Sequence, residues 1–361
     1  MSRPAKVNIN LTALRKNFSR VKNLAPKSSI LSVVKADAYG HGLSRVAETL
    51  QQSDAFGVAC VEEAIELRDA GVDRPILLLE GPFTFEELTL VAALKLDIVV
   101  HHAEQIKMIE RFQSDYQIPV WLKIDTGMHR LGFDVGSIKQ VHEKLLSLKN
   151  IKDEIVLMSH YADAANPDAS ITKTQSTKFQ ELTQNLSCKR SMCNSAGIIN
   201  QSNSHYDYVR PGLMLYGVSP INNKVSSDFD LTPVMSLHSE LIAIKSVNKG
   251  DTVGYGATWR CPEDMPVGIV AIGYGDGYPR HAKSGTPVMI NGLQAQLIGH
   301  PSMDMITVDL RGISGAKIGD PVELWGDNLP VELVAKHAET IAYELLSGVH
   351  KRLNVNIYDE D

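Results

Sequence analysis

The stretch ILSVV at residues 30–34, followed by LSRVAETL at residues 43–50 and AFGV at residues 55–58, decides the predicted fold. The first and third segments are short and apolar, as the buried strands of a parallel sheet are. In the second segment, apolar residues recur at the three- and four-residue spacing of one helix face. Strand, helix and strand in this order form one β-α unit, and repeated units of this kind build a parallel sheet.

The same alternation continues along the first two thirds of the chain. Eight such units within about 200 residues are typical of a closed (β/α)8 barrel. We therefore predict an α/β protein whose N-terminal domain, residues 1–230, is a (β/α)8 barrel of the TIM type. The strands are expected near residues 30–34, 55–58, 76–79, 97–100, 119–122, 154–157, 190–193 and 206–209.

After about residue 230 the pattern changes, because helical periods give way to alternating apolar runs that are broken by turn residues. Asn291-Gly292 lies between two such runs and predicts a tight hairpin, since Asn and Gly tolerate the positive φ of its turn. One helix is expected near the end, over about residues 331–346. We predict a C-terminal, mostly β domain over residues 231–361.

Composition and charge are those of an ordinary globular protein. The chain has 361 residues, of which 43% are hydrophobic and 22% charged, and its formal net charge is -6 without a Lys/Arg-rich run. A nucleic-acid or membrane surface is therefore not expected, and a small molecule is the predicted partner. We expect a cytoplasmic location, because no signal-peptide core and no membrane-length apolar run are present. The four cysteines lack metal-ligand spacing, so no metal is predicted.

Polar residues at predicted strand ends are the candidates for chemistry, because the active site of such a barrel lies where its strands end. Lys35 closes the first strand, and a lysine after a buried strand can be desolvated enough to act as a Schiff-base amine. Lys123 and Arg130 follow the fifth strand, and His160 ends the sixth. Taken singly, each also fits a structural role: a snorkelling lysine, a solvated arginine or a satisfied histidine.

Two further segments have the features of a phosphate seat. NSAG at residues 194–197 follows the seventh strand at a helix start, and YVRPGL at residues 208–213 follows the eighth. Loops after these two strands frequently bind phosphate through backbone N–H groups. Ser195 alone is equally well explained as an N-cap, and Arg210 as a surface ion-pair residue. The conjunction of a reactive lysine at strand one with a phosphate seat at strands seven and eight favours the functional interpretation.

Together these segments resemble the alanine racemase family, bacterial enzymes with a barrel, a β domain and the cofactor pyridoxal 5'-phosphate. The strongest motif is VKADAYGHG at residues 34–42, which is similar to the family's cofactor-lysine signature. The resemblance spans nearly the whole chain. Its other motifs are DTGMHRLG (125–132), NSAG (194–197), RPG (210–212), GYGAT (254–258), GYGDGY (273–278), MD (303–304) and AYE (342–344).

The resemblance implies a binding site for pyridoxal 5'-phosphate. Lys35 would hold the cofactor covalently, and Arg210 would face its pyridine nitrogen. Because a guanidinium does not give up its proton, the ring would be a weakened electron sink, which favours reprotonation at Cα over transamination or decarboxylation. The cofactor-binding set implied by the family is Lys35, Tyr39, His160, Ser195, Arg210, Gly212, Leu213 and Tyr343.

The resemblance also implies two catalytic bases. Racemisation takes a proton from one face of a planar adduct and delivers one to the other face, so two bases are natural. Lys35 would serve D-alanine, and Tyr255, from the β domain of a second subunit, would serve L-alanine. His160 and Arg210 would tune the phenol through hydrogen bonds. The implied protein is a homodimer with shared sites that interconverts L- and D-alanine and supplies D-alanine for peptidoglycan.

Other residues gain expected roles by the same resemblance. Arg130 and the backbone N–H of Met303 would bind the substrate carboxylate, and Lys123, which is carbamylated in many relatives, would orient Arg130. The sequence departs from the family pattern at two places. After His160 no acidic residue stands at the spacing usual for the family's entrance channel, and Asp163 is the expected substitute. Ser302 stands where some relatives carry cysteine. Supporting roles fall to Asp304, Tyr274 and Arg280, the last two at the substrate entrance.

Three alternatives stay open on sequence grounds. A pyridoxal-phosphate amino-acid decarboxylase would share the fold but lack the GYGAT motif. A non-catalytic cofactor carrier would end after its barrel, whereas this chain continues for about 130 residues. A racemase with a broader amino-acid range would share every motif above.

Overall fold

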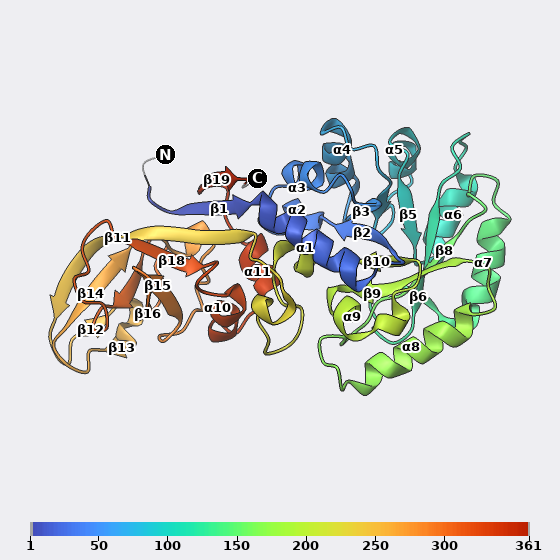
Figure 1. Cartoon of the computed structure of the whole chain (residues 1–361). Coiled ribbons are helices and arrows are strands. Elements are labelled where there is room, and N and C mark those ends of the chain that lie inside the picture. The colour runs from blue at the N-terminus through green and yellow to red at the C-terminus, as the bar shows by residue number, and fades with distance from the viewer. Residues whose placement is uncertain (1–2, 360–361) are drawn as a thin grey trace.

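Eight parallel strands close into a barrel in the N-terminal part of the protein (Figure 1). In the computed structural model, which describes residues 3–359, these strands pair in the order β5-β4-β3-β2-β10-β9-β8-β6, and pairing of β5 with β6 closes the ring. The predicted (β/α)8 barrel is thus confirmed. The strands are β2 (Ser29–Val33), β3 (Ala55–Val58), β4 (Ile76–Leu78), β5 (Asp97–Val100), β6 (Val120–Asp125), β8 (Val156–Met158), β9 (Lys189–Asn194) and β10 (Tyr208–Arg210), with the short β7 (Phe133–Asp134) beside β6.

Alternation along the strands gives the barrel two cores. Side chains that point inward, among them Leu31, Val33, Leu77, Val99 and Trp121, form one buried cluster inside the ring. Their sequence neighbours point outward and pack under the helices in a second, larger cluster. Because both faces are covered, most of these strands are largely apolar, which is why they were recognisable in the sequence.

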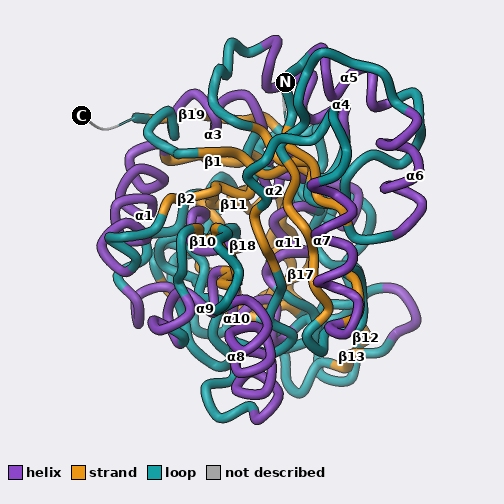
Figure 2. Tube along the Cα trace, turned by 90° about the vertical axis from the view of Figure 1, so that its right-hand side faces the viewer, coloured by secondary structure: helices purple, strands orange, loops and turns teal. Residues whose placement is uncertain are grey.

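Helices surround the strands when the barrel side faces the viewer (Figure 2). Helix α1 begins at the N-cap Asn10, whose side chain accepts the N–H of Ala13, and α4 ends before Gly71, whose φ is +80°. No helix within residues 3–359 is both long enough and apolar enough to cross a bilayer. The helices are α1 (Leu11–Leu24), α2 (Lys35–Gly40), α3 (Leu43–Thr49), α4 (Val61–Asp69), α5 (Glu87–Ala93), α6 (Ala103–Arg111), α7 (Ile138–Leu146), α8 (Ser170–Thr183) and α9 (Ser195–Asn200).

A second sheet of eight strands forms the other half of the protein, in the order β14-β17-β16-β15-β18-β11-β1-β19 with a further β14–β11 pairing. The predicted mostly β region is confirmed, and Asn291 and Gly292 turn its hairpin at φ of 51° and 78°. Residues 1–2 and 360–361 of the two predicted domains lie outside the described residues. The strands are β1 (Lys6–Asn10), β11 (Met235–Val247), β14 (Met265–Val270), β15 (Pro287–Ile290), β16 (Leu293–Leu297), β17 (Ile306–Asp309), β18 (Pro321–Trp325) and β19 (Asn354–Tyr358), and a separate hairpin joins β12 (Thr252–Val253) to β13 (Trp259–Arg260).

The N-terminal strand belongs to this second sheet. β1 pairs antiparallel with β11 and parallel with β19, so both ends of the chain contribute to the C-terminal sheet. Strands β1 and β19 accordingly lie side by side in Figure 1. The chain crosses from the second sheet into the barrel at α1 and returns along the long strand β11.

The prediction of a single helix over about residues 331–346 is wrong. The structure has two helices, α10 (Val331–His337) and α11 (Ala342–Ser347), and the chain turns between them at Glu339, which has a φ of 53°. The apolar period continues across the turn, and for that reason the sequence did not reveal the break. The turn directs α11 against α2 at the barrel, where Tyr343 reaches the cavity described below.

Candidate active site

A cavity of about 680 Å³ opens at the carboxyl ends of the barrel strands. Most of its lining residues lie at a strand end or in the segment that follows it, and α11 contributes Tyr343 and Ser347. Every site residue that was predicted within the barrel lines this cavity. They are Lys35, Tyr39, Lys123, Arg130, His160, Ser195, Arg210, Gly212 and Leu213, joined by Tyr343.

The segment after Lys35 has an unusual backbone. Residues Ala36 to Tyr39 have φ of 52–55° and ψ of 38–55°, so α2 contains a left-handed turn. This conformation costs each non-glycine residue about 1–2 kcal/mol. Strain of this kind persists only where surrounding contacts enforce it, and it is concentrated at functional sites.

Hydrogen bonds with Glu63, in the next β-α unit, and with the nearby His41 hold the left-handed turn. The Glu63 carboxylate accepts the N–H of Ala36 at 2.7 Å and that of Ala59 at 2.8 Å, which ties the turn to the next β-α unit. The buried His41 ring contacts the carbonyls of Ala38 and Tyr39 through Nδ1 at 3.0 and 2.9 Å. Because a carbonyl only accepts, Nδ1 carries the ring proton. The turn thereby directs the Tyr39 side chain into the cavity beside Lys35.

Tyr39, Tyr343, Ser195 and the Gly212-Leu213 backbone converge at one end of the cavity. Tyr39 stacks on Tyr216 with ring centroids 4.7 Å apart and lies 5.8 Å from the Tyr343 ring. Burial, and secondly the neighbouring Tyr343, raises the pKa of Tyr39, and burial raises that of Tyr343. Both phenols therefore keep their protons at neutral pH and can donate hydrogen bonds.

Ser195 and Gly212 shape the same end of the cavity. The Ser195 hydroxyl accepts the N–H of Gly212 at 2.9 Å and that of Met214 at 3.3 Å. Asn194, and not Ser195, is the N-cap of α9, because its side chain accepts the N–H of Gly197 at 2.9 Å. A Cβ on Gly212 would lie 2.5 Å from the Tyr39 hydroxyl, so only glycine leaves room for the phenol. Hydroxyl and N–H groups gathered in this way suit an anion such as a phosphate.

Arg210 is fixed at the centre of the barrel mouth. Its guanidinium donates to the Ser191 hydroxyl at 2.5 Å, to the Ser159 carbonyl at 2.6 Å and to the Met192 carbonyl at 3.2 Å. Burial lowers its pKa to about 10, which leaves it cationic at neutral pH. The interpretation of Arg210 as a surface ion-pair residue is therefore wrong, since the side chain is buried among neutral acceptors.

His160 and Lys123 share this electropositive environment. Nη2 of Arg210 lies 3.3 Å from Nδ1 of His160, and because arginine only donates, Nδ1 accepts. Burial, followed by the charges of Arg210 and Lys123, lowers the pKa of His160 well below its usual value, so the ring is neutral. Burial, followed by Arg210, Arg130 and Lys35, lowers the pKa of Lys123 to about 8. Part of the Lys123 amine is consequently neutral and nucleophilic near physiological pH.

Apart from Tyr343, the predicted residues of the second domain do not line this cavity. Tyr255 begins a 3₁₀ turn between β12 and β13, and 70% of it is exposed. Met303 is 54% exposed and Tyr274 is 38% exposed, in loops that contact each other through the Tyr274 N–H and the Ser302 carbonyl. Asp304 is half-buried beside them, and Arg280 is exposed. These loops point outward from the chain that carries them.

Sequence reasoning missed several lining residues. Glu80 follows β4 and lines the cavity, and the strand-end rule used for Lys35 would have found it. Asn194 and Ser347 line it as well, although only Asn194 lay in a quoted motif. Asp163, the substitute proposed for an entrance residue, is half-buried and is not part of the lining.

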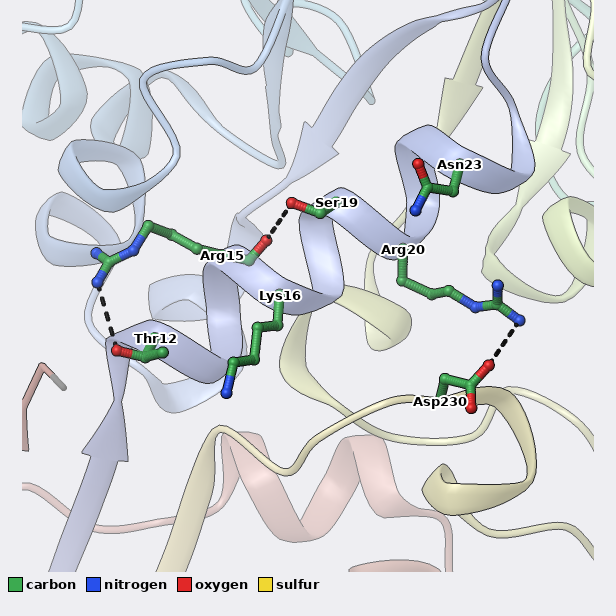
Figure 3. Close-up of a pocket in the computed structure, with 7 residues that line it drawn as sticks. All are labelled: Thr12, Arg15, Lys16, Ser19, Arg20, Asn23 and Asp230. Carbon is green, nitrogen blue, oxygen red and sulfur yellow. Dashed lines mark hydrogen bonds and ion pairs between the residues drawn. The ribbon is translucent and has the colours of Figure 1, made fainter. Parts of the chain in front are cut away.

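Another hollow lies on the outer face of α1 and contains none of the predicted residues (Figure 3). It is lined by polar and charged side chains, and its two arginines are engaged in ion pairs, Arg20 with Asp230 and Arg15 with Asp359. The barrel-mouth cavity remains the candidate active site.

Fold and site together define the class of two-domain proteins that join a (β/α)8 barrel to a β domain and carry a lysine after the first barrel strand. The chain belongs to the alanine racemase family: the family model "Alanine racemase, N-terminal domain" matches residues 9–220, and "Alanine racemase, C-terminal domain" matches residues 234–357.

Similar proteins cover nearly the full length. An alanine racemase of Nitrosococcus oceani is 50% identical over 96% of this chain and 97% of its own, and one of Coxiella burnetii is 46% identical over 97% of each. Among solved structures, the biosynthetic alanine racemase from Pseudomonas aeruginosa matches with a TM-score of 0.96 at 42% identity, covering 99% of both chains. Alanine racemase from Acinetobacter baumannii matches with a TM-score of 0.94 at 40% identity, over 99% of this chain and all of that one.

Proposed function

We propose that the protein interconverts L-alanine and D-alanine with pyridoxal 5'-phosphate as cofactor, in a homodimer whose active sites are shared between subunits. The observation that carries the proposal is the convergence, in one cavity, of Lys35 with an anion seat and the fixed Arg210 guanidinium. Family membership and the relatives' names agree with this activity.

The residues of the cavity fit the cofactor. The space beside Gly212 that a Cβ would fill, the two protonated phenols and the Ser195 hydroxyl suit its phosphate. Arg210 would face the pyridine nitrogen and, as a permanent cation with four neighbours already engaged, would leave that nitrogen unprotonated. When bound, the cofactor supplies an electron sink that acidifies the Cα–H bond of the amino acid.

Lys35 and Tyr255 are the proposed bases. The Lys35 amine would hold or release a proton at Nζ on one face of the substrate, and the Tyr255 phenol would do so at Oη on the other. Tyr255 is exposed on its own chain. Contact with a second copy of the chain would remove this large aromatic side chain from water, which is favourable. The neutral His160 ring, held by Arg210, would tune the phenol of the partner subunit.

Arg130 and the Met303 N–H are the proposed ligands of the substrate carboxylate. Arg130 lines the cavity, and Met303, in an exposed loop that contacts the Tyr274 loop, would approach from the partner subunit. The partly neutral Lys123 amine is suited to react with carbon dioxide, and the resulting carbamate would orient Arg130. Asp304, Tyr274 and Arg280 would support this side of the site.

The decarboxylase alternative is not favoured, because the relatives are alanine racemases in both domains. The proposal includes supply of D-alanine for peptidoglycan and a cytoplasmic location. A broader substrate range is tested by the same experiment that tests the activity. Purified protein with pyridoxal 5'-phosphate is incubated with L-alanine, L-serine or L-ornithine, and the products are resolved on a chiral column. We expect D-alanine from L-alanine; release of carbon dioxide without D-alanine would refute the proposal.

A further inference from the structure

Two arginines from opposite ends of the chain bind the same pair of carboxylates. Arg3 lies 2.9 Å from Asp276 through Nη2 and 3.0 Å from Asp304 through Nη1. Arg352 lies 2.8 Å from Asp276 through Nε and 2.8 Å from Asp304 through Nη2. The four side chains form a closed ring of alternating charge, which we call the arginine–aspartate quartet.

Strand pairing explains why the chain ends meet at this point. β1 and β19 are parallel neighbours in which Lys6 lies opposite Asn354. Arg3 and Arg352 come shortly before the starts of these two strands, so both side chains emerge at the same edge of the sheet. The two carboxylates follow β14 and precede β17, which are also paired in this sheet.

Asp276 anchors the quartet. Its side chain is 0% exposed, and it accepts a further hydrogen bond from the Gly273 N–H at 2.9 Å. Its carbonyl accepts the N–H of His350 at 3.1 Å, which binds the C-terminal segment to the same loop. These donors offset the cost of burying the carboxylate, so Asp276 is a rigid point to which Arg3 and Arg352 are attached.

The quartet holds the backbone of the loop that carries Met303. Arg3 donates to the Asp304 carbonyl at 3.2 Å, and Arg352 donates to the Met303 carbonyl at 3.4 Å. The Gly275 N–H also donates to the Met303 carbonyl, at 2.9 Å. Hydrogen bonds from Arg352 and then Arg3 hold the pKa of Asp304 below its usual range, so the carboxylate is ionised at neutral pH.

The Met303 N–H is left available by these contacts. Within residues 3–359 it donates to no acceptor, whereas the carbonyls of Met303 and Asp304 both accept hydrogen bonds. Two glycines permit this packing: a Cβ on Gly273 would collide with the Ser302 carbonyl, and one on Gly275 would lie 2.7 Å from Arg352. The result is an unpaired N–H in an exposed loop whose carbonyl groups are held by hydrogen bonds.

We infer that Arg3 and Arg352 are positioning residues that orient the Met303 N–H toward the substrate carboxylate in the partner subunit's site. The inference rests on the proposed function and deepens it, because it makes substrate affinity depend on the two ends of the chain. Each guanidinium bridges two carboxylates through different nitrogens, which the single amine of a lysine cannot reproduce.

The test uses the holoenzyme with Arg352→Gln and Arg352→Lys. Because the carboxylate is common to both enantiomers, we expect KM for L- and D-alanine to rise together, about tenfold in Arg352→Gln and less in Arg352→Lys, with kcat within about twofold. Inhibition by propionate, which has the carboxylate but not the amine of alanine, should weaken by the same factor. The visible absorbance of the bound cofactor should not change, because the barrel is untouched.

Arg311→Gln is the matched control. Arg311 is a half-exposed arginine of the same domain that pairs with Asp309 and Glu263 and has no contact with Met303 or Asp304. Its KM values should equal those of the parent protein. An equal rise in Arg311→Gln, or an unchanged KM and propionate inhibition in folded Arg352→Gln, would overturn the inference.

A variant that fails to fold does not end the test. Arg3→Gln breaks the other bridge while Arg352 still links both carboxylates, and it should raise KM in the same direction by a smaller factor. Unchanged KM values in folded Arg3→Gln and Arg352→Lys would overturn the inference. Absence of alanine racemisation by the parent protein would instead refute the proposed function, and the inference with it.

Discussion

Replacing Tyr39 by phenylalanine should weaken cofactor binding without weakening the fold. The phenol is buried against Tyr216 and Tyr343, and it faces the cavity beside Gly212 and Ser195. Its raised pKa keeps it a donor at neutral pH. A hydrogen bond from such a donor to a charged phosphate contributes about 1.5–3 kcal/mol. Its loss corresponds to a dissociation constant for pyridoxal 5'-phosphate that is about 10- to 150-fold higher.

The neighbouring Tyr216 provides a matched control, because its hydroxyl makes a hydrogen bond within the fold and not to the cofactor. Its hydroxyl donates to the Val33 carbonyl at 3.0 Å inside the fold. Tyr216→Phe should therefore lower the free energy of unfolding by about 1 kcal/mol and leave cofactor affinity nearly unchanged. Tyr39→Phe should show the reverse, with a free energy of unfolding of the apoprotein within about 0.5 kcal/mol of the parent value.

The assay is a titration of each apoprotein with pyridoxal 5'-phosphate, followed by visible absorbance, together with urea unfolding of the same preparations. Unchanged cofactor affinity in Tyr39→Phe would refute the assignment of this end of the cavity to the phosphate. Equal losses of affinity in the two variants would show that loss of either buried hydroxyl weakens cofactor binding, and would argue against a specific hydrogen bond from Tyr39 to the phosphate.

Three further outcomes follow from the cavity. Lys35→Ala should abolish the visible absorbance of the lysine-bound cofactor while Lys123→Ala retains it; an unchanged spectrum in Lys35→Ala would contradict the assignment. Because burial lowers the pKa of Lys123 to about 8, its neutral amine increases about tenfold between pH 7 and pH 9. At fixed dissolved carbon dioxide, carbamate formation from ¹³C-labelled carbon dioxide should rise over this range and be absent in Lys123→Met, whereas pH-independent labelling would argue against the lysine. Mixing inactive Lys35→Ala and Tyr255→Phe subunits should restore part of the activity, and failure to do so despite proven subunit exchange would argue against a shared site.

The barrel strands and the hairpin at Asn291-Gly292 were predictable because their signals are local. A strand covered on both faces is mostly apolar, and the sequence predicted every barrel strand within two residues of its observed start. In the barrel half of the candidate site, the strand-end rule singled out Lys35, Lys123, Arg130, His160, Ser195 and Arg210, whereas Tyr39 and the roles of Gly212 and Leu213 came from the family resemblance. The grouping of these side chains in one cavity agrees with that reasoning, while their chemical roles stay predictions.

Features that depend on distant contacts were not predictable. The left-handed turn at residues 36–39 is tied by Glu63, which lies 27 positions beyond Ala36, and alanine and tyrosine do not themselves favour positive φ. The quartet joins Arg3 to carboxylates more than 270 positions away in the sequence. The membership of β1 in the second sheet and the chain reversal at Glu339 also depend on tertiary pairing that no periodic pattern encodes.

Solvent hydrogen exchange at Cα of alanine tests the two-base arrangement most directly. In deuterium oxide, Tyr255→Phe should incorporate deuterium into L-alanine far more slowly than the parent protein does, while exchange into D-alanine, served by Lys35, is largely retained. Mass spectrometry of each enantiomer after short incubation measures both rates. Equal slowing for the two enantiomers would contradict the assignment of one base to each face.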